Sequence, residues 1–142
     1  MKLRIRARDL PTRVSTGAYI LHAGLGKWDA DEARAQGVHA AAAGAFPFLK
    51  RISPRRFARL LALGEIATGT ALLAPVVPAS LAGGALTLFS GTLIAMYLRT
   101  PAMHLPGSVW PTPAGTAVSK DVWMLGVGLG LLVEAAAEAR DR

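Results

Sequence analysis

The residues best suited to chemistry are three polar side chains in apolar surroundings: Glu65, His22 and Lys27. Glu65 is the one charged side chain between Leu60 and Leu98. A carboxylate inside hydrocarbon is costly, and such groups generally face the interior of a helix bundle and serve a function. Glu65 lies six residues after Arg59, roughly 9 Å along a helix. On an antiparallel helix, His22 and Lys27 reach a similar depth, so the sequence predicts a polar cluster of Glu65, His22 and Lys27.

Two interpretations of this cluster stay open. In the functional one, the cluster hydrogen-bonds a quinone carbonyl or relays a proton, because histidine titrates near neutral pH. In the structural one, Glu65 ties two helices together through Lys27 or a backbone group, and His22 makes an ordinary interhelix hydrogen bond. His22 and Lys27 are five residues apart, roughly 140° around a helix, so both cannot point squarely at one partner.

Several kinds of site are excluded by residue type and spacing. The chain has no cysteine, which excludes disulfides, thiolate metal sites and a cysteine nucleophile. His39 and His104 form no HxxxH or HExxH pattern, and there is no GxGxxG or P-loop. We therefore expect no metal site and no nucleotide site. The sequence provides no evident cofactor site, and quinone is the one candidate that the Glu65 cluster suggests.

The stretch Leu60–Leu98 is about twice the roughly 20 apolar residues that a helix needs to cross a bilayer. Pro75 and Pro78 interrupt it, and each removes a backbone donor and stops helix propagation. The composition is 52% hydrophobic and 18% charged, and the charged share is below the ~25% usual in soluble domains. The sequence therefore predicts an integral membrane protein with two spans folded back around a proline turn.

The whole chain predicts a single all-α domain, residues 1–142, built as a four-helix membrane bundle. The expected spans are 10–28, 57–74, 79–98 and 120–136. The apolar segment 37–49 is too short to cross, since ~13 helical residues extend only ~20 Å. We expect it to form a re-entrant or interfacial helix, with a fifth span as the alternative. The glycines of the spans are expected to pack helices closely together.

The formal charge is +7. The cations lie at the ends of apolar runs, where they meet lipid headgroups, so membrane lipid is the expected partner and nucleic acid is not. The predicted lipid-facing basic cluster is Lys50, Arg51, Arg55 and Arg56, and the predicted interfacial anchors are Trp28, Trp110 and Trp123. The arm 1–9, which includes Lys2 and Arg4, is expected to be interfacial. Its charge predicts a cytoplasmic N-terminus in a multi-pass protein of the cell membrane.

Three motifs together resemble the DoxX family of small bacterial membrane proteins. They are GLGKW (24–28), LALGEIATGTALL (61–73) and KDVWMLG (120–126). Glu65 and Gly69 match the E-x-x-x-G pattern of the second span in that family. The resemblance covers roughly residues 13–133, whereas the GSVWPTP loop (107–113) is similar only to actinobacterial relatives. A four-helix membrane bundle is the fold that this resemblance implies.

The resemblance also implies a setting in redox or sulfur metabolism. Some relatives are linked to thiosulfate:quinone oxidoreduction, and another to a complex with a superoxide dismutase and a sulfurtransferase. The first hypothesis is a non-catalytic membrane subunit, with or without self-association, that docks a redox or sulfurtransferase partner protein. The alternative is a quinone-reactive oxidoreductase subunit with a Glu65-centred pocket lined by His22, Tyr19 or Trp123. The absence of an evident redox centre favours the first hypothesis. A transporter is a weaker third reading, because one carboxylate provides no polar path.

Overall fold

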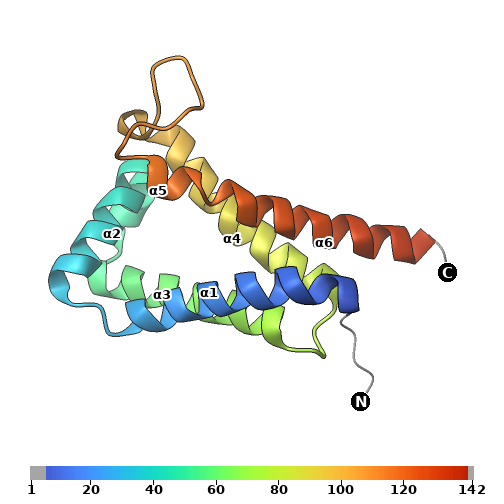
Figure 1. Ribbon diagram of the computed structural model, residues 1–142. Coiled ribbons are helices and arrows are strands. Elements are labelled where there is room, and N and C mark those ends of the chain that lie inside the picture. The colour runs from blue at the N-terminus through green and yellow to red at the C-terminus, as the bar shows by residue number, and fades with distance from the viewer. Residues whose placement is uncertain (1–5, 141–142) are drawn as a thin grey trace.

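The computed structural model describes residues 6–140, which form an all-helical chain (Figure 1). Lys2 and Arg4 of the predicted interfacial arm lie outside these residues. Within 6–140 there is no strand, and one isolated bridge pairs His104 with Pro111. The helices are η1 (Ala7–Asp9), α1 (Leu10–Trp28), α2 (Glu32–Ala45), η2 (Pro47–Arg51), α3 (Pro54–Leu73), α4 (Ala79–Arg99), η3 (Pro101–Met103), α5 (Thr116–Ser119) and α6 (Val122–Arg140).

The long helices form two antiparallel pairs that diverge from one another (Figure 1). α1 packs along α3, α4 packs along α6, and α3 contacts α4 near the turn between them. α1 makes hardly any contact with α4 or α6, so the described helices do not close into the expected compact bundle. The first pair and the second pair lie close at the end that carries the 75–78 turn, and α2 lies across the opposite, wide end (Figure 1).

Glycines explain why the contacts are made within pairs. A Cβ atom added at Gly69 would lie 2.7 Å from the backbone nitrogen of Leu21, so α1 and α3 touch backbone to backbone. A Cβ at Gly128 would lie 2.5 Å from Thr87 Oγ1, so α4 and α6 are equally close. Other glycines do not have the predicted packing role: nothing lies within 4 Å of a Cβ built at Gly26, Gly64, Gly84, Gly91, Gly126 or Gly130.

The two pairs share a small apolar core. Ile20 and Leu72 from the first pair and Ala82, Leu86, Met124 and Leu131 from the second belong to one buried cluster. Burying such side chains contributes roughly 1.5–3 kcal/mol each for the larger ones. This core holds the two pairs together, and α2 lies across the wide end.

The connecting helix α2 begins earlier than the sequence predicted. Asp31 is the N-cap, and its carboxylate accepts a 2.8 Å hydrogen bond from the backbone N–H of Arg34. The helix ends at Ala45 because Pro47 follows, and the chain continues as the 3-10 helix η2. The predicted segment 37–49 thus divides into the second half of α2 and the first half of η2. With 14 residues, α2 is about 21 Å long, too short to cross a bilayer.

Two helical segments of residues 6–140 are long and apolar enough to cross a membrane: Ala79–Arg99 and the continuous α5–α6 segment Thr116–Arg140. Only 28% and 17% of their most apolar windows are buried within the protein. A core helix of a soluble protein would be mostly covered, so these two helices leave a large apolar surface to be covered by something else. α1 and α3, with 19 and 20 residues, are long enough to cross, but they are less apolar than these two segments.

Candidate functional site

Lys27 and Glu65 form an ion pair between α1 and α3. The distance from Lys27 Nζ to Glu65 Oε1 is 2.9 Å, and only 19% and 8% of the two side chains are exposed. The close approach begins one turn earlier, where a Cβ at Gly24 would lie 2.9 Å from the Cβ of Glu65. The GLGK segment therefore positions the Lys27 ammonium beside the Glu65 carboxylate. Gly24 lets α3 approach α1 closely, and Lys27 lies on the same side of α1 as Gly24.

The ion pair does not use every hydrogen-bonding group of the two side chains. Oε2 of Glu65 is buried and has no hydrogen-bond partner among the described residues. Lys27 makes one further long contact, 3.5 Å to the carbonyl of Ala23 in its own helix. Asp121, just before α6, is in electrostatic range of both Lys27 and Glu65, and Arg34 of α2 is in range of Glu65. Charges from all parts of the wide end therefore converge near this pair.

His22 does not belong to the cluster that the sequence predicted. Its side chain is exposed, and within residues 6–140 it makes no hydrogen bond. Lys27 takes the inward-facing position instead, and the roughly 140° between the two residues turns His22 away from α3. Tyr19 is exposed as well. The structure thus reduces the predicted Glu65, His22 and Lys27 cluster to an ion pair.

Two cavities lie in the described chain near the predicted site, and Glu65 lines neither of them. One cavity of about 210 Å³ lies at the ends of α1 and α3 and is lined by Lys27, Trp28, Arg55 and Arg59, but not by Glu65. Ligand sites usually have volumes of about 300–1,000 Å³. A larger groove of about 700 Å³ is lined by Trp123 and lies between α1 and α6, again without Glu65. Neither of these two cavities is the expected pocket at Glu65, because neither is lined by Glu65, His22 or Tyr19.

Sequence reasoning missed the most strongly bonded buried side chain, Arg13. It is fully buried, and its guanidinium donates to the carbonyls of Leu72 (2.8 Å), Ala71 (2.9 Å), Ala74 (3.2 Å) and Val77 (3.2 Å). The last carbonyls of a helix lack partners within the helix and carry a partial negative charge. Arg13 supplies those donors at the end of α3. A signal was available, since antiparallel pairing places the start of span 10–28 level with the end of span 57–74.

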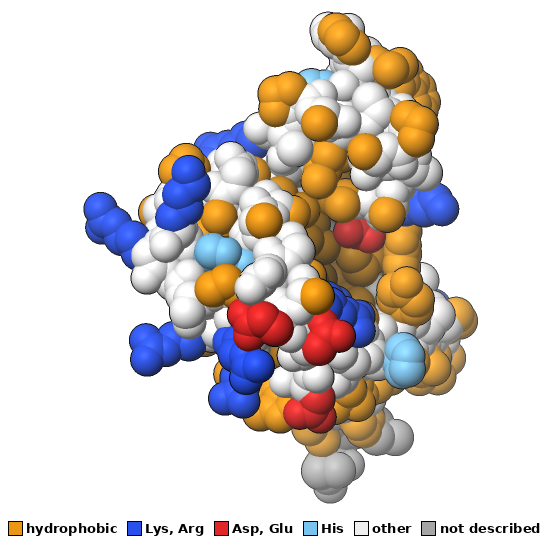
Figure 2. Space-filling view, turned by 90° about the vertical axis from the view of Figure 1, so that its left-hand side faces the viewer, with side chains coloured by type: hydrophobic (Ala, Val, Ile, Leu, Met, Phe, Trp, Pro, Cys, Tyr) orange, Lys and Arg blue, Asp and Glu red, His pale blue; other side chains and the backbone are white. Residues whose placement is uncertain are grey.

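The predicted lipid-facing basic cluster is exposed. Lys50, Arg51, Arg55 and Arg56 all project from η2 and the first turn of α3. Figure 2 shows Lys and Arg side chains on this face of the molecule, beside a hollow lined by hydrophobic side chains. Arg55 Nε lies 2.6 Å from an oxygen of Glu32 in α2, and this hydrogen bond lowers the pKa of Glu32. Arg55 is thus partly neutralised, and it links α2 to α3.

The three tryptophans lie at the wide end of the structure. Trp28 ends α1, Trp123 lies in the first turn of α6, and Trp110 lies in the connection between α4 and α6. That connection is ordered: Tyr97 donates a 2.7 Å hydrogen bond to the carbonyl of Val109, and Leu105 N–H bonds the carbonyl of Trp110. Trp110 is nevertheless 72% exposed and Val109 68% exposed. A fixed loop therefore presents large apolar side chains outward.

No known protein family, curated protein or solved structure matches the chain. The resemblance to the DoxX family therefore stays a prediction that rests on the three sequence motifs.

Proposed function

We propose that the chain is a four-span helical protein of the cell membrane, with α1, α3, α4 and α6 as the spans and α2 at the interface. In this arrangement the two termini share the cytoplasmic side, and the wide end with its basic cluster faces the opposite side. Lipid covers the exposed faces of α4 and α6, whose burial within the protein is low.

Its proposed role is that of a non-catalytic membrane subunit that docks a redox or sulfur-metabolism partner protein, in keeping with the DoxX resemblance. The observation that carries this proposal is the ordered loop that holds Val109 and Trp110 outward. Exposed large apolar side chains on a rigid support are typical of binding sites, and tryptophan is enriched among the residues that dominate protein interfaces. Trp110 is thus the proposed docking residue.

The alternative, a quinone-reactive subunit, draws less support from the geometry. It requires a ligand-sized pocket at Glu65, whereas one Glu65 oxygen is taken up by Lys27 and the residue lines neither of the two cavities described above. An ion pair of this kind ties two helices together. The second oxygen of Glu65, which has no hydrogen-bond partner among the described residues, is the one feature that supports the quinone hypothesis.

Purification from native membranes in mild detergent, followed by mass spectrometry, tests the proposal. The wild-type chain is compared with Trp110→Ala and with Trp28→Ala, a matched control at the same end. We expect a dehydrogenase, dismutase or sulfurtransferase to be retained by the wild type and Trp28→Ala, and to be lost with Trp110→Ala. Retention of quinone alone, lost in Glu65→Ala, would favour the alternative, and retention of neither would contradict both.

A further inference from the structure

The larger of the two cavities described above is a groove between the N-terminal end of α1 and the length of α6. Its volume is about 700 Å³. Along α6 it follows the helical face formed by Trp123, Gly126, Val127, Gly130, Leu131 and Glu134. Trp123 and Glu134 are eleven residues apart, so the groove is roughly 16 Å long at 1.5 Å per residue. It exists because α1 and α6 diverge instead of packing together.

Two glycines make the floor of the groove. Gly126 and Gly130 are four residues apart on one face of α6, and nothing lies within 4 Å of a Cβ built at either position. In contrast, Gly128 between them is in close contact with α4. Gly126 and Gly130 therefore leave space that no part of the described protein fills.

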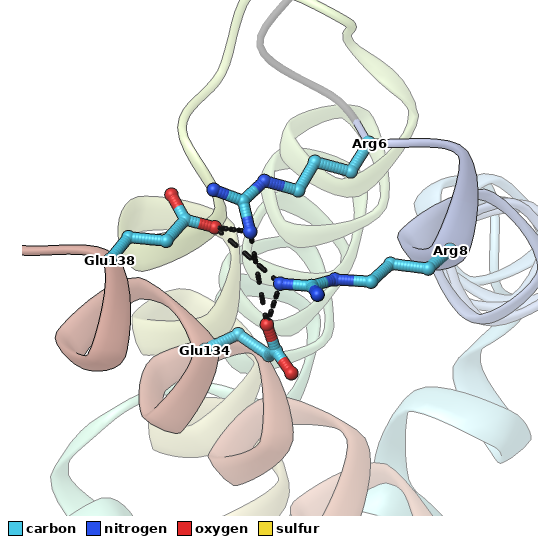
Figure 3. Close-up of polar contacts among 4 residues, drawn as sticks. All are labelled: Arg6, Arg8, Glu134 and Glu138. Atoms are coloured by element: carbon cyan, nitrogen blue, oxygen red, sulfur yellow. Dashed lines mark hydrogen bonds and ion pairs between the residues drawn. The ribbon is translucent and has the colours of Figure 1, made fainter. Parts of the chain in front are cut away.

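The end of the groove near Glu134 is polar. Figure 3 shows Arg6 and Arg8, which precede α1, directed at Glu134 and Glu138 of α6, with ion pairs between the two sets. Arg8 and Glu134 line the groove and are both partly exposed. Because a guanidinium has five N–H donors and a carboxylate has about four acceptor positions, their mutual contact leaves both able to bind a ligand.

Asp9 adds a second carboxylate to the groove. It also lines the groove, and only 8% of the residue is exposed. It occupies the N-cap position of α1, yet its side chain makes no capping hydrogen bond, and no donor within residues 6–140 bonds its carboxylate. The side-chain oxygens of Asp9 are not among the buried, unpartnered polar atoms of residues 6–140. A carboxylate only accepts hydrogen bonds, so Asp9 suits a ligand with N–H donors.

We propose that this groove binds one molecule of phosphatidylethanolamine, with an acyl chain over Gly126 and Gly130 and the headgroup at Arg8, Asp9 and Glu134. The guanidinium of Arg8 suits the phosphodiester, and the two carboxylates suit the primary ammonium. The lining charge of one cation and two anions favours a zwitterionic headgroup over an anionic one. This inference rests on the proposed membrane setting.

Trp123 provides a reporter within the groove. In the chain with Trp28→Phe and Trp110→Phe, it is the sole tryptophan, and its fluorescence in detergent micelles is titrated with phospholipids that carry brominated acyl chains. We expect quenching by phosphatidylethanolamine to saturate at one lipid per chain. Phosphatidylcholine and phosphatidylglycerol with the same chains should bind at least roughly tenfold more weakly, because each loses a charge-assisted hydrogen bond.

Variants of the groove show whether the quenching comes from lipid bound at this site. Gly126→Leu/Gly130→Leu should abolish saturable quenching, whereas the control Gly84→Leu/Gly91→Leu, at two open positions of α4, should retain it. Asp9→Asn should remove the preference over phosphatidylcholine. The proposal would be overturned by quenching that never saturates or by equal quenching in both Leu pairs. Tighter binding of phosphatidylglycerol would also overturn it, as would a dimer that only Gly126→Leu/Gly130→Leu dissociates. Membrane insertion and partner docking are measured separately, so failure here would leave the proposed function standing.

Discussion

Lys27 Nζ lies 2.9 Å from Glu65 Oε1, and this contact joins α1 to α3 at a point where Gly24 lets the two helices approach closely. The carboxylate gains a cationic partner and keeps one oxygen without a hydrogen bond in the described chain. An ion pair this deeply covered is costly to break from one side, because the remaining charge stays buried. The pair therefore acts first as a structural tie between the two helices.

Removal of the ammonium tests this role. Lys27→Met should lower the free energy of unfolding by about 3 kcal/mol, since it leaves the Glu65 carboxylate buried without a partner. Glu65→Gln should cost less, because the amide still accepts a hydrogen bond from Lys27. The double variant Lys27→Met/Glu65→Leu should recover most of the loss. Thermal unfolding in detergent, followed by circular dichroism, measures all three; a Lys27→Met variant as stable as the wild type would contradict the account.

Two glycines of α3 form a matched pair. A Cβ at Gly69 would lie 2.7 Å from backbone of α1, so Gly69→Ala should force the helices apart and destabilise the chain by about 1–3 kcal/mol. Gly64 faces open space in the same helix, so Gly64→Ala should stabilise by roughly 0.5–1 kcal/mol through helix propensity. The same unfolding measurement compares them. Equal effects of the two substitutions would show that the α1–α3 contact is not as close as described.

Arg13 should be essential for the end of α3. Arg13→Met leaves the carbonyls of Ala71, Leu72 and Val77 without this donor, at a cost of about 1–3 kcal/mol for each one that stays buried and unbonded. The carbonyl of Ala74 keeps a 3.2 Å hydrogen bond from the N–H of Val77. Arg13→Lys should be intermediate, because a single ammonium cannot reach all four. Hydrogen exchange of the last turn of α3 and the 75–78 turn reports the effect locally. Unchanged protection in Arg13→Met would exclude the capping role.

The link between α2 and α3 should depend on pH. The hydrogen bond from Arg55 lowers the pKa of Glu32 in the folded chain. A lowered carboxyl pKa stabilises the fold above the unfolded-state value of about 4.3, and this contribution is lost as the pH falls through the folded-state pKa. Wild type should therefore exceed Glu32→Gln in melting temperature at neutral pH, with the difference vanishing in acid. A difference that persists or grows in acid would contradict this assignment.

The sequence predicted the helices well because composition and breakers set them locally. Pro75 and Pro78 separate α3 from α4 as expected, and Trp28 ends α1. The start of α2 was missed because it depends on Asp31, whose capping role is visible in the sequence but was outweighed by the apolar run after it. Helix bounds thus followed from short-range chemistry.

The arrangement of the helices was harder to predict. The Lys27–Glu65 contact could be anticipated because the two residues lie at a similar depth along antiparallel helices. The exposure of His22, however, depends on how α1 is rotated about its axis. The glycines at 64, 126 and 130 carry no sequence sign that distinguishes them from Gly69 or Gly128. Which faces meet is decided by long-range packing, and this is why the divergence of the two pairs and the groove could not be foreseen.

The most direct test of the account is the membrane topology of the chain. Because the sequence has no cysteine, single substitutions Ala33→Cys, Pro54→Cys, Val76→Cys and Ser108→Cys can be labelled one at a time from either side of intact cells. Four spans with an interfacial α2 place positions 33, 54 and 108 outside and position 76 in the cytoplasm. Opposite sides for 33 and 54 would instead establish five spans, and labelling of 76 from the same side as 108 would contradict the four-span protein.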